Sequence, residues 1–186
     1  MRYSYYVQGY YQLLFQYGND KAQFYVKSQD DLFKGLDFLN AEEIWINELV
    51  TYPKLYNVLD NLEQYAKRNN IKIKMLLHDY FAVCPTINLL DVNEKYCGIP
   101  DCEKKCEECF RNVHPDYKKE YGSMEEWRSK WGSFLKVCHS IVVFSEDSQK
   151  ILQRVYGNLD NVEVIPHQVG YMPEITKHYK TTKTFN

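Results

Sequence analysis

The chain has 186 residues, with 23 Lys and Arg against 25 Asp and Glu, so its formal net charge is −2. This length predicts one domain with its own core and is too short for two full α/β domains. A hydrophobic share of 45% and a charged share of 26% argue against a disordered chain. The nearly balanced charge argues against a protein that works by gripping a nucleic-acid backbone, so no nucleic-acid partner is expected.

The sequence carries no targeting segment that we can identify. No apolar run approaches the ~20 residues that a transmembrane helix needs, and no apolar segment follows Arg2 as it would in a secretory signal. Six cysteines in a chain without an export signal are more readily explained as metal ligands than as disulfides.

Strand-like and helix-like patterns alternate along most of the chain. The first 27 residues alternate around Gly9 and the turn at Gly18, which predicts two or three short strands, the first two as a hairpin. Strands are then predicted at 23–27, 43–47, 71–77, 141–144 and 162–165, with helices beginning near residues 28, 52, 123 and 145. Residues 78–121 show no periodicity and are predicted to be irregular.

This order predicts an α/β domain with a mainly parallel sheet and helices on both faces. We expect a single domain over 1–175 with a cysteine-rich loop at 84–109, followed by a polar linker at 176–186. Ligands of such sheets bind beyond the carboxyl ends of the strands. Here those ends carry the following side chains: Asn47 and Glu48, His78 and Asp79, Ser145, and His167.

Each of these polar residues has a structural explanation as well as a functional one. His78 and Asp79 follow a core strand and form the leading candidate for a site, although an Asp there also bonds loop amides. Asn47 and Glu48 have the same placement. Ser145 can offer its hydroxyl and free helix amides to an anion, or simply cap the helix. His167 can line the same edge or shape a turn after Pro166.

The cysteines form the most specific pattern that the residues give by themselves. Cys106 and Cys109 form a C-x-x-C pair, whose thiolates can share one tetrahedral zinc ion. Cys97 is a natural third ligand, and Cys84 or Cys102 the fourth. Four thiolates would close the coordination shell, so the zinc is expected to be structural. Free thiols or a redox pair are the alternatives, but a redox C-x-x-C normally opens a helix after a strand.

Several short segments, taken in order, resemble bacterial family 4 glycosyltransferases. They are residues 47–53, 77–85, 88–91, Tyr96-Cys97, Cys106 with Cys109, Trp127-Arg128, Phe144-Ser145 and 165–167. These enzymes have the GT-B fold, in which two Rossmann-like domains face a cleft. The resemblance spans roughly residues 40–175 and concerns the N-terminal, acceptor-side domain. Motifs of other enzyme classes, such as G-x-S-x-G and G-x-x-x-x-G-K, are absent from the sequence.

The resemblance implies a function in bacterial polysaccharide synthesis. A sugar would pass, with retention of configuration, from a nucleotide-sugar donor to a glycan or lipid-linked acceptor. The donor would be held by a C-terminal domain that we expect beyond this chain, so the isolated chain is expected to be inactive. His78 matches a family histidine near the transferred sugar, Asp79 lies beside it, and Cys84 matches better than Cys102 as the fourth zinc ligand. A cytoplasmic location is implied, and association with the inner membrane surface is compatible with it.

A different class of function also fits the sequence. The chain can be a non-catalytic, zinc-containing module that binds a glycan or a protein. The two hypotheses differ in whether a second Rossmann-like domain belongs to the same protein.

Overall fold

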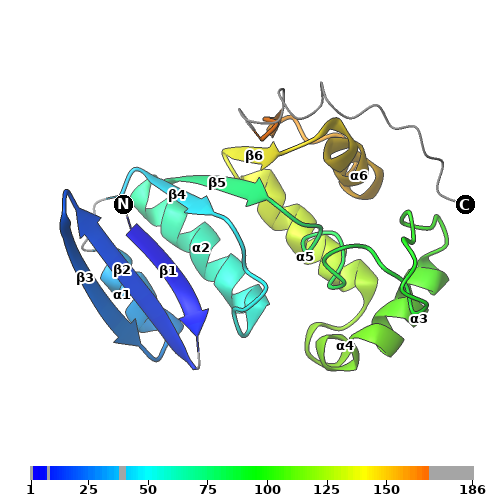
Figure 1. The fold of residues 1–186 in the computed structure, drawn as a ribbon, viewed down its shortest axis with the longest axis horizontal. Helices are drawn as coiled ribbons and strands as arrows, with labels where there is room; N and C mark the ends of the chain where they lie inside the picture. Colours follow the sequence, from blue (N-terminus) through cyan, green and yellow to red (C-terminus); the bar gives the residue numbers. More distant parts are fainter. Residues whose placement is uncertain (1, 8, 38–40, 168–186) are drawn as a thin grey trace, which may run out of the picture.

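A computed structural model describes residues 2–7, 9–37 and 41–167 of the chain (Figure 1). The expected linker at 176–186 and the end of the expected domain lie outside these residues. The elements are β1 (Arg2–Val7), β2 (Tyr10–Tyr17), β3 (Asp20–Val26), α1 (Gln29–Asp37), β4 (Glu43–Ile46), α2 (Leu55–Asn69), β5 (Lys72–Leu77), α3 (Glu103–Val113), α4 (Pro115–Tyr121), α5 (Met124–Val137), β6 (Ser140–Val143), α6 (Glu146–Tyr156) and β7 (Val162–Val164).

The central layer is a parallel sheet of four strands in the order β4-β5-β6-β7. Ile44 pairs with Ile73, Met75 with Ile141, and Val143 with Val164, each in parallel register. Strand β6 is buried along its whole length, as its apolar run predicts for a central parallel strand. The structure thus confirms a mixed α/β fold built on a parallel sheet.

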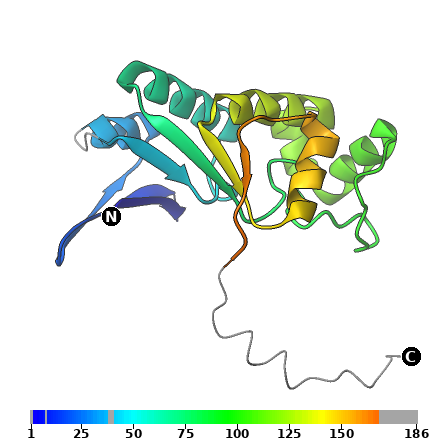
Figure 2. The ribbon, with the colours of Figure 1, turned by 90° about the horizontal axis from the view of Figure 1, so that it is seen from above.

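The connecting helices share one layer, which corrects the prediction of helices on both faces. Helix α5 packs against α2 on one side and α6 on the other (Figure 2). The reason lies in the strand order. Each strand pairs with the next one along the chain, and successive right-handed crossovers in one direction place every helix on the same face. A helix on the opposite face requires the strand order to reverse, and the order in the described sheet does not.

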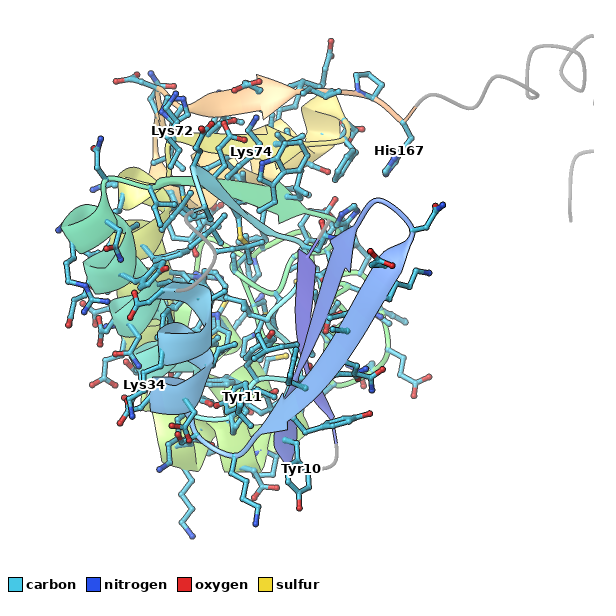
Figure 3. The ribbon with its side chains drawn as sticks, turned by 90° about the vertical axis from the view of Figure 1, so that its left-hand side faces the viewer. Tyr10, Tyr11, Lys34, Lys72, Lys74 and His167 are labelled. Atoms are coloured by element: carbon cyan, nitrogen blue, oxygen red, sulfur yellow. The ribbon has the colours of Figure 1, made fainter. Side chains whose placement is uncertain are left out.

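The other face of the sheet carries polar and aromatic side chains. Trp45 is 60% exposed, and its indole N–H donates to the Glu43 carboxylate at 2.7 Å. The ammonium group of Lys74 lies 4.8 Å from the centre of the Trp45 ring. In Figure 3, Lys72 and Lys74 lie in a row that leads towards His167. This face is therefore solvated in its β4–β5 half.

The N-terminal strands form a sheet of their own, so the prediction that residues 23–27 open the parallel sheet was wrong. Strands β1, β2 and β3 make an antiparallel meander at one end of the molecule (Figure 1). A two-residue turn at Gly18, where φ is 57°, joins β2 to β3, and so short a connection can only link antiparallel neighbours. Tyr11 and Leu13 of β2 pack with Leu32 of α1 into a small separate core.

Residues 78–121 are not irregular throughout, because they contain α3 and α4. The apolar periodicity that marks a helix is missing from α3, whose single buried side chain is Phe110. Most of the rest of this helix is charged or consists of cysteines, so its helical repeat could not be recognised. The loop before it is organised by backbone hydrogen bonds such as Cys97 N–H to the Leu89 carbonyl, at 2.9 Å.

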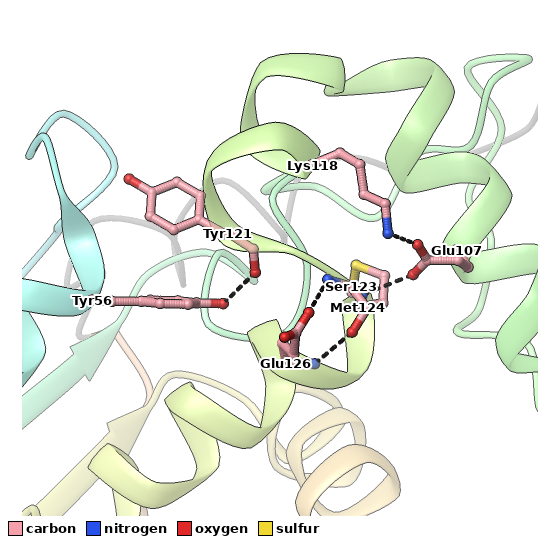
Figure 4. A network of polar contacts seen from close by, with 7 residues as sticks. All are labelled: Tyr56, Glu107, Lys118, Tyr121, Ser123, Met124 and Glu126. Carbon is pink, nitrogen blue, oxygen red and sulfur yellow. Dashed lines mark hydrogen bonds and ion pairs between the residues drawn. The ribbon is translucent and has the colours of Figure 1, made fainter.

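Helix α5 is the element around which this half of the molecule packs. As predicted, a capping box begins it: the Ser123 hydroxyl accepts from the Glu126 amide, and the Glu126 carboxylate accepts from the Ser123 amide (Figure 4). Its predicted apolar face is buried, and Trp127 and Trp131 have no exposed surface. The Trp127 indole N–H donates to the Phe81 carbonyl at 3.2 Å, which ties the helix to the loop after β5.

The phenol of Tyr121, the last residue of α4, caps the first turn of α2. Lys54, which precedes the helix, offers no side-chain cap, and the Leu55 amide donates instead to the Tyr121 hydroxyl at 3.2 Å. The Tyr56 hydroxyl in turn donates to the Tyr121 carbonyl at 3.1 Å (Figure 4). Leu55 is only 1% exposed, so its amide cannot turn to water if the phenol is lost.

We therefore expect Tyr121→Phe to lower the free energy of unfolding by about 1–3 kcal/mol, the cost of leaving a buried donor unpaired. Urea denaturation followed by circular dichroism measures this change. Tyr96→Phe is the matched control, because Tyr96 is 60% exposed, and it should alter stability by no more than about 0.5 kcal/mol. Equal stability of the two variants would contradict the capping role of Tyr121.

Candidate functional site

Two of the predicted site residues meet at the carboxyl edge of the parallel sheet. His78 directly follows β5, and His167 lies three residues beyond β7. Both imidazoles are exposed and lie nearly parallel, with ring centres 6.0 Å apart. Phe144, directly after β6, stacks against each of them, 4.6 Å from His78 and 4.1 Å from His167. We call these three rings the aromatic stack.

The position of the aromatic stack follows from the topology. Strands β5, β6 and β7 are parallel neighbours, so the residues that follow them emerge side by side. The sequence predicted His78 and His167 here but assigned Phe144 no role of its own. The signal for Phe144 was its place directly after a strand of the parallel sheet, which it shares with His78.

The other predicted residues at this edge make mainly local contacts. A carboxylate oxygen of Asp79 accepts from the Phe81 amide at 2.9 Å, which fixes the turn after β5. The Ser145 hydroxyl accepts from the Ser148 amide at 3.1 Å and caps α6. These are the structural explanations that the sequence left open. They also hold the backbone on either side of the aromatic stack.

Asn47 and Glu48 follow the edge strand β4 and are exposed. Because Ile46 pairs with Met75, the chain leaves β4 before the level at which His78 leaves β5. No hydrogen bond, ion pair or ring contact joins either residue to the aromatic stack within the described chain. The structure therefore brings His78 and His167 together and leaves Asn47 and Glu48 apart from them.

The hollows found in the described surface lie on the helix side instead. One groove runs between α2 and α5, with Asp60 and Lys130 on its walls. A second, of about 1160 Å³, lies between α3, α5 and α6 and is lined in part by Cys106 and Arg128. Neither is lined by His78 or His167. Both imidazoles of the stack are exposed, and the chemistry of the stack makes it the candidate site.

The four cysteines preferred as zinc ligands gather in one region, which we call the thiol cluster (Cys84, Cys97, Cys106 and Cys109). All four are half-buried. Partial burial and the nearby thiolates of Cys84, Cys97 and Cys106 raise the pKa of Cys109 to about 11. Cys102, the alternative ligand, is exposed just before α3 and does not contribute to this effect.

Different elements hold the members of the thiol cluster. Cys106 and Cys109 lie one turn apart on α3, whose Phe110 anchors the helix in the core. The Cys97 sulfur accepts a long hydrogen bond from the Ile99 amide, at 3.5 Å. Burial raises the pKa of Cys84, whose sulfur lies 3.2 Å from the Thr86 hydroxyl. The donor set suits zinc, although no three His, Cys, Asp or Glu side chains of the described residues lie in metal-holding geometry.

Comparisons with protein-family models, with curated proteins and with solved structures give no match to this chain. The functional argument therefore depends on the geometry and on the residues themselves. In the described part of the chain, no helix combines the length and the apolar character needed to cross a membrane.

The sixth cysteine, Cys138, provides a test of burial. Burial raises the pKa of its thiol from 9.0 to about 12. Between these values the native state keeps the proton while the unfolded chain releases it, so the unfolding free energy falls as pH rises. Cys138→Ala should make this fall shallower, by at most about 1.4 kcal/mol per pH unit.

Urea denaturation at several pH values between 8 and about 10.5 measures the slope. Cys102→Ala is the matched control, because Cys102 is exposed, and its slope should equal that of the unaltered protein. A Cys138→Ala protein with the unaltered slope would contradict the shifted pKa.

Proposed function

We propose that this chain is the Rossmann-like, acceptor-side domain of a retaining glycosyltransferase of the GT-B type that acts in polysaccharide synthesis. The observation that carries the proposal is the aromatic stack at the carboxyl ends of three neighbouring parallel strands. Ligands of parallel α/β sheets bind at this edge. The ordered resemblance to family 4 glycosyltransferases includes all three residues of the stack.

The chemistry of the stack suits a sugar acceptor. An imidazole is the side chain whose charge changes most readily near neutral pH, so His78 can take a proton from a hydroxyl group or donate a hydrogen bond to it. The stack combines the apolar ring of Phe144 with two imidazoles that can form hydrogen bonds, which suits a sugar ring with its apolar faces and polar rim. Asp79 and Ser145 support this edge through the turn and cap that they form.

The open edge is consistent with a site shared between two domains. In this proposal a second domain binds the nucleotide-sugar donor and closes over the stack, while this chain presents the glycan or lipid-linked acceptor. A lipid-linked acceptor would place the protein at the inner face of the membrane. The same openness favours the second candidate, a non-catalytic module that binds a glycan or a protein at this edge, since neither described groove reaches the stack.

The first test is saccharide binding by the full 186-residue chain. Oligosaccharides from bacterial capsular and lipid-linked repeats are screened on an array, and positives are measured by saturation-transfer NMR. We expect His78→Ala and His167→Ala each to abolish binding of any saccharide that the unaltered chain binds. His139→Ala is the matched control, because His139 is exposed at the opposite, amino-terminal end of β6.

The outcomes decide whether the stack binds a saccharide acceptor. Binding that depends on His78 and His167, with no transfer from UDP- or GDP-sugars by the chain alone, agrees with an acceptor-side domain and equally with a glycan-binding module. A second Rossmann-like domain in the same protein would favour the enzyme. Transfer by the chain alone would contradict the shared site. Saccharide binding that all three variants retain, or no binding to any saccharide, would overturn the assignment of the stack as an acceptor site.

We further propose that the thiol cluster holds one structural zinc ion that ties the loop at 84–102 to α3. Two cysteines of α3, one turn apart, lie near two from the preceding loop, and the set can supply four thiolates. The raised pKa values of Cys84 and Cys109 describe thiols without a metal. A bound zinc ion would reverse this preference, because thiolates are the form that it ligates.

Elemental analysis under reducing conditions tests the zinc site. The purified chain should contain about one zinc, and Cys106→Ser or Cys109→Ser should lose most of it together with part of the thermal stability. Cys138→Ser is the control, since Cys138 lies outside the cluster, and should keep the metal. Equal metal content in all three variants would sink the assignment.

A further inference from the structure

We infer that Arg128 is the charge partner of the thiol cluster: its guanidinium positions Cys106 and offsets the negative charge of the metal-bound thiolates. The inference rests on the proposed zinc site. It assigns Arg128 to that site as a positioning residue, a role that the cysteine spacing could not indicate because Arg128 lies on a different helix.

The contacts of Arg128 join the two halves of the cluster. From α5, its Nη2 donates to the Cys106 sulfur at 3.5 Å, and its Nε donates to the Val83 carbonyl at 3.3 Å. Val83 precedes Cys84 in the chain, so one planar guanidinium spans the loop that carries Cys84 and the helix that carries Cys106. The N–H donors of a guanidinium lie in one plane at fixed angles, so they suit two acceptors whose separation is also fixed.

Among the described residues, no carboxylate pairs with the charge of Arg128. Three basic side chains of the same helix layer form ion pairs: Lys118 with Glu107, Lys130 with Asp60, and Arg154 with Asp101. Arg128 is half-buried, yet within the described residues no ion pair joins it to a carboxylate.

A half-buried cation is expected to have a compensating anion. A zinc ion of charge +2 with four thiolates carries a net charge of −2. The positively charged guanidinium therefore lies where it would offset part of the negative charge of such a centre. A hydrogen bond from Arg128 to the Cys106 sulfur would also fix the direction in which that ligand points, as outer partners of metal ligands commonly do.

The test compares zinc affinity among variants of the full chain, measured by competition with a chromophoric chelator. We expect Arg128→Gln to weaken zinc binding 10- to 100-fold, the range typical for the loss of an outer partner of a metal ligand. Arg128→Lys keeps the charge but loses the planar set of donors, so its affinity should fall between those of Arg128→Gln and the unaltered chain. Arg154→Gln is the matched control, because Arg154 borders the same groove but pairs with Asp101.

A purely structural role for Arg128 would not change the metal centre itself. We therefore also record the sulfur-to-metal absorption band after substitution with Co²⁺, which should move in Arg128→Gln and stay in place in Arg154→Gln. If Arg128→Gln does not fold, as judged by circular dichroism, Arg128→Lys decides: zinc affinity and cobalt spectrum equal to those of the unaltered chain would overturn the inference.

The remaining outcomes separate this inference from the proposal beneath it. If the unaltered chain binds one zinc and Arg128→Gln binds it as tightly as Arg154→Gln does, the zinc site stands and the role of Arg128 is wrong. If the unaltered chain binds no zinc at all, the zinc site itself fails and the inference fails with it.

Discussion

The burial of Trp127 is the interaction on which the C-terminal two thirds of the structure depends. Its ring has no exposed surface and packs against Tyr56 of α2, Phe81 of the loop after β5 and Phe110 of α3. Tyr117 and Tyr121 of α4 complete this shell. A single indole thus fixes how three helices and a long loop meet. The cost of removing so large a buried group, typically about 3–5 kcal/mol, is comparable with the whole stability of many domains.

The placement of the thiol cluster is a consequence of this core. Phe110 holds α3 against Trp127, and Phe81 holds the loop that leads to Cys84, while Arg128 follows Trp127 directly in the chain. The burial that sets the helices therefore also sets which sulfur atoms and which cation share one region. A metal ion at the cluster would add a second constraint to a loop that its buried side chains, Leu89 and Ile99 among them, already anchor in the core.

The sheet explains why the candidate site is open. Ligand crevices of doubly wound folds form where the strand order reverses and helices diverge to both faces. The order β4-β5-β6-β7 has no such reversal, so α2, α5 and α6 stay together and leave the carboxyl edge uncovered by them. This edge is therefore distinguished by its side chains and not by the walls of a cleft. The aromatic stack supplies two exposed imidazoles that pack against a phenyl ring, which is a surface that a partner or a second domain can complete.

By itself, the sequence determined the elements whose signals are local. The capping box at Ser123, the apolar face of α5, the continuous apolar run of β6 and the alternation of β5 are all patterns within a few neighbouring residues, and each was confirmed. It failed where the signal was weak or not local. Helix α3 buries only Phe110, so no periodicity revealed it, and the separate sheet of β1–β3 depends on a pairing choice that alternation alone cannot make.

Only the tertiary structure decided how distant residues combine. It brought His78 and His167 together against Phe144, gave the start of α2 a phenol from α4, and placed Arg128 between Val83 and Cys106. These pairs are separated by 22 or more residues, and nothing in the local pattern of either partner specifies the other. Local propensity fixes an element, whereas the partners of its side chains follow from strand order and from which large rings fill the core.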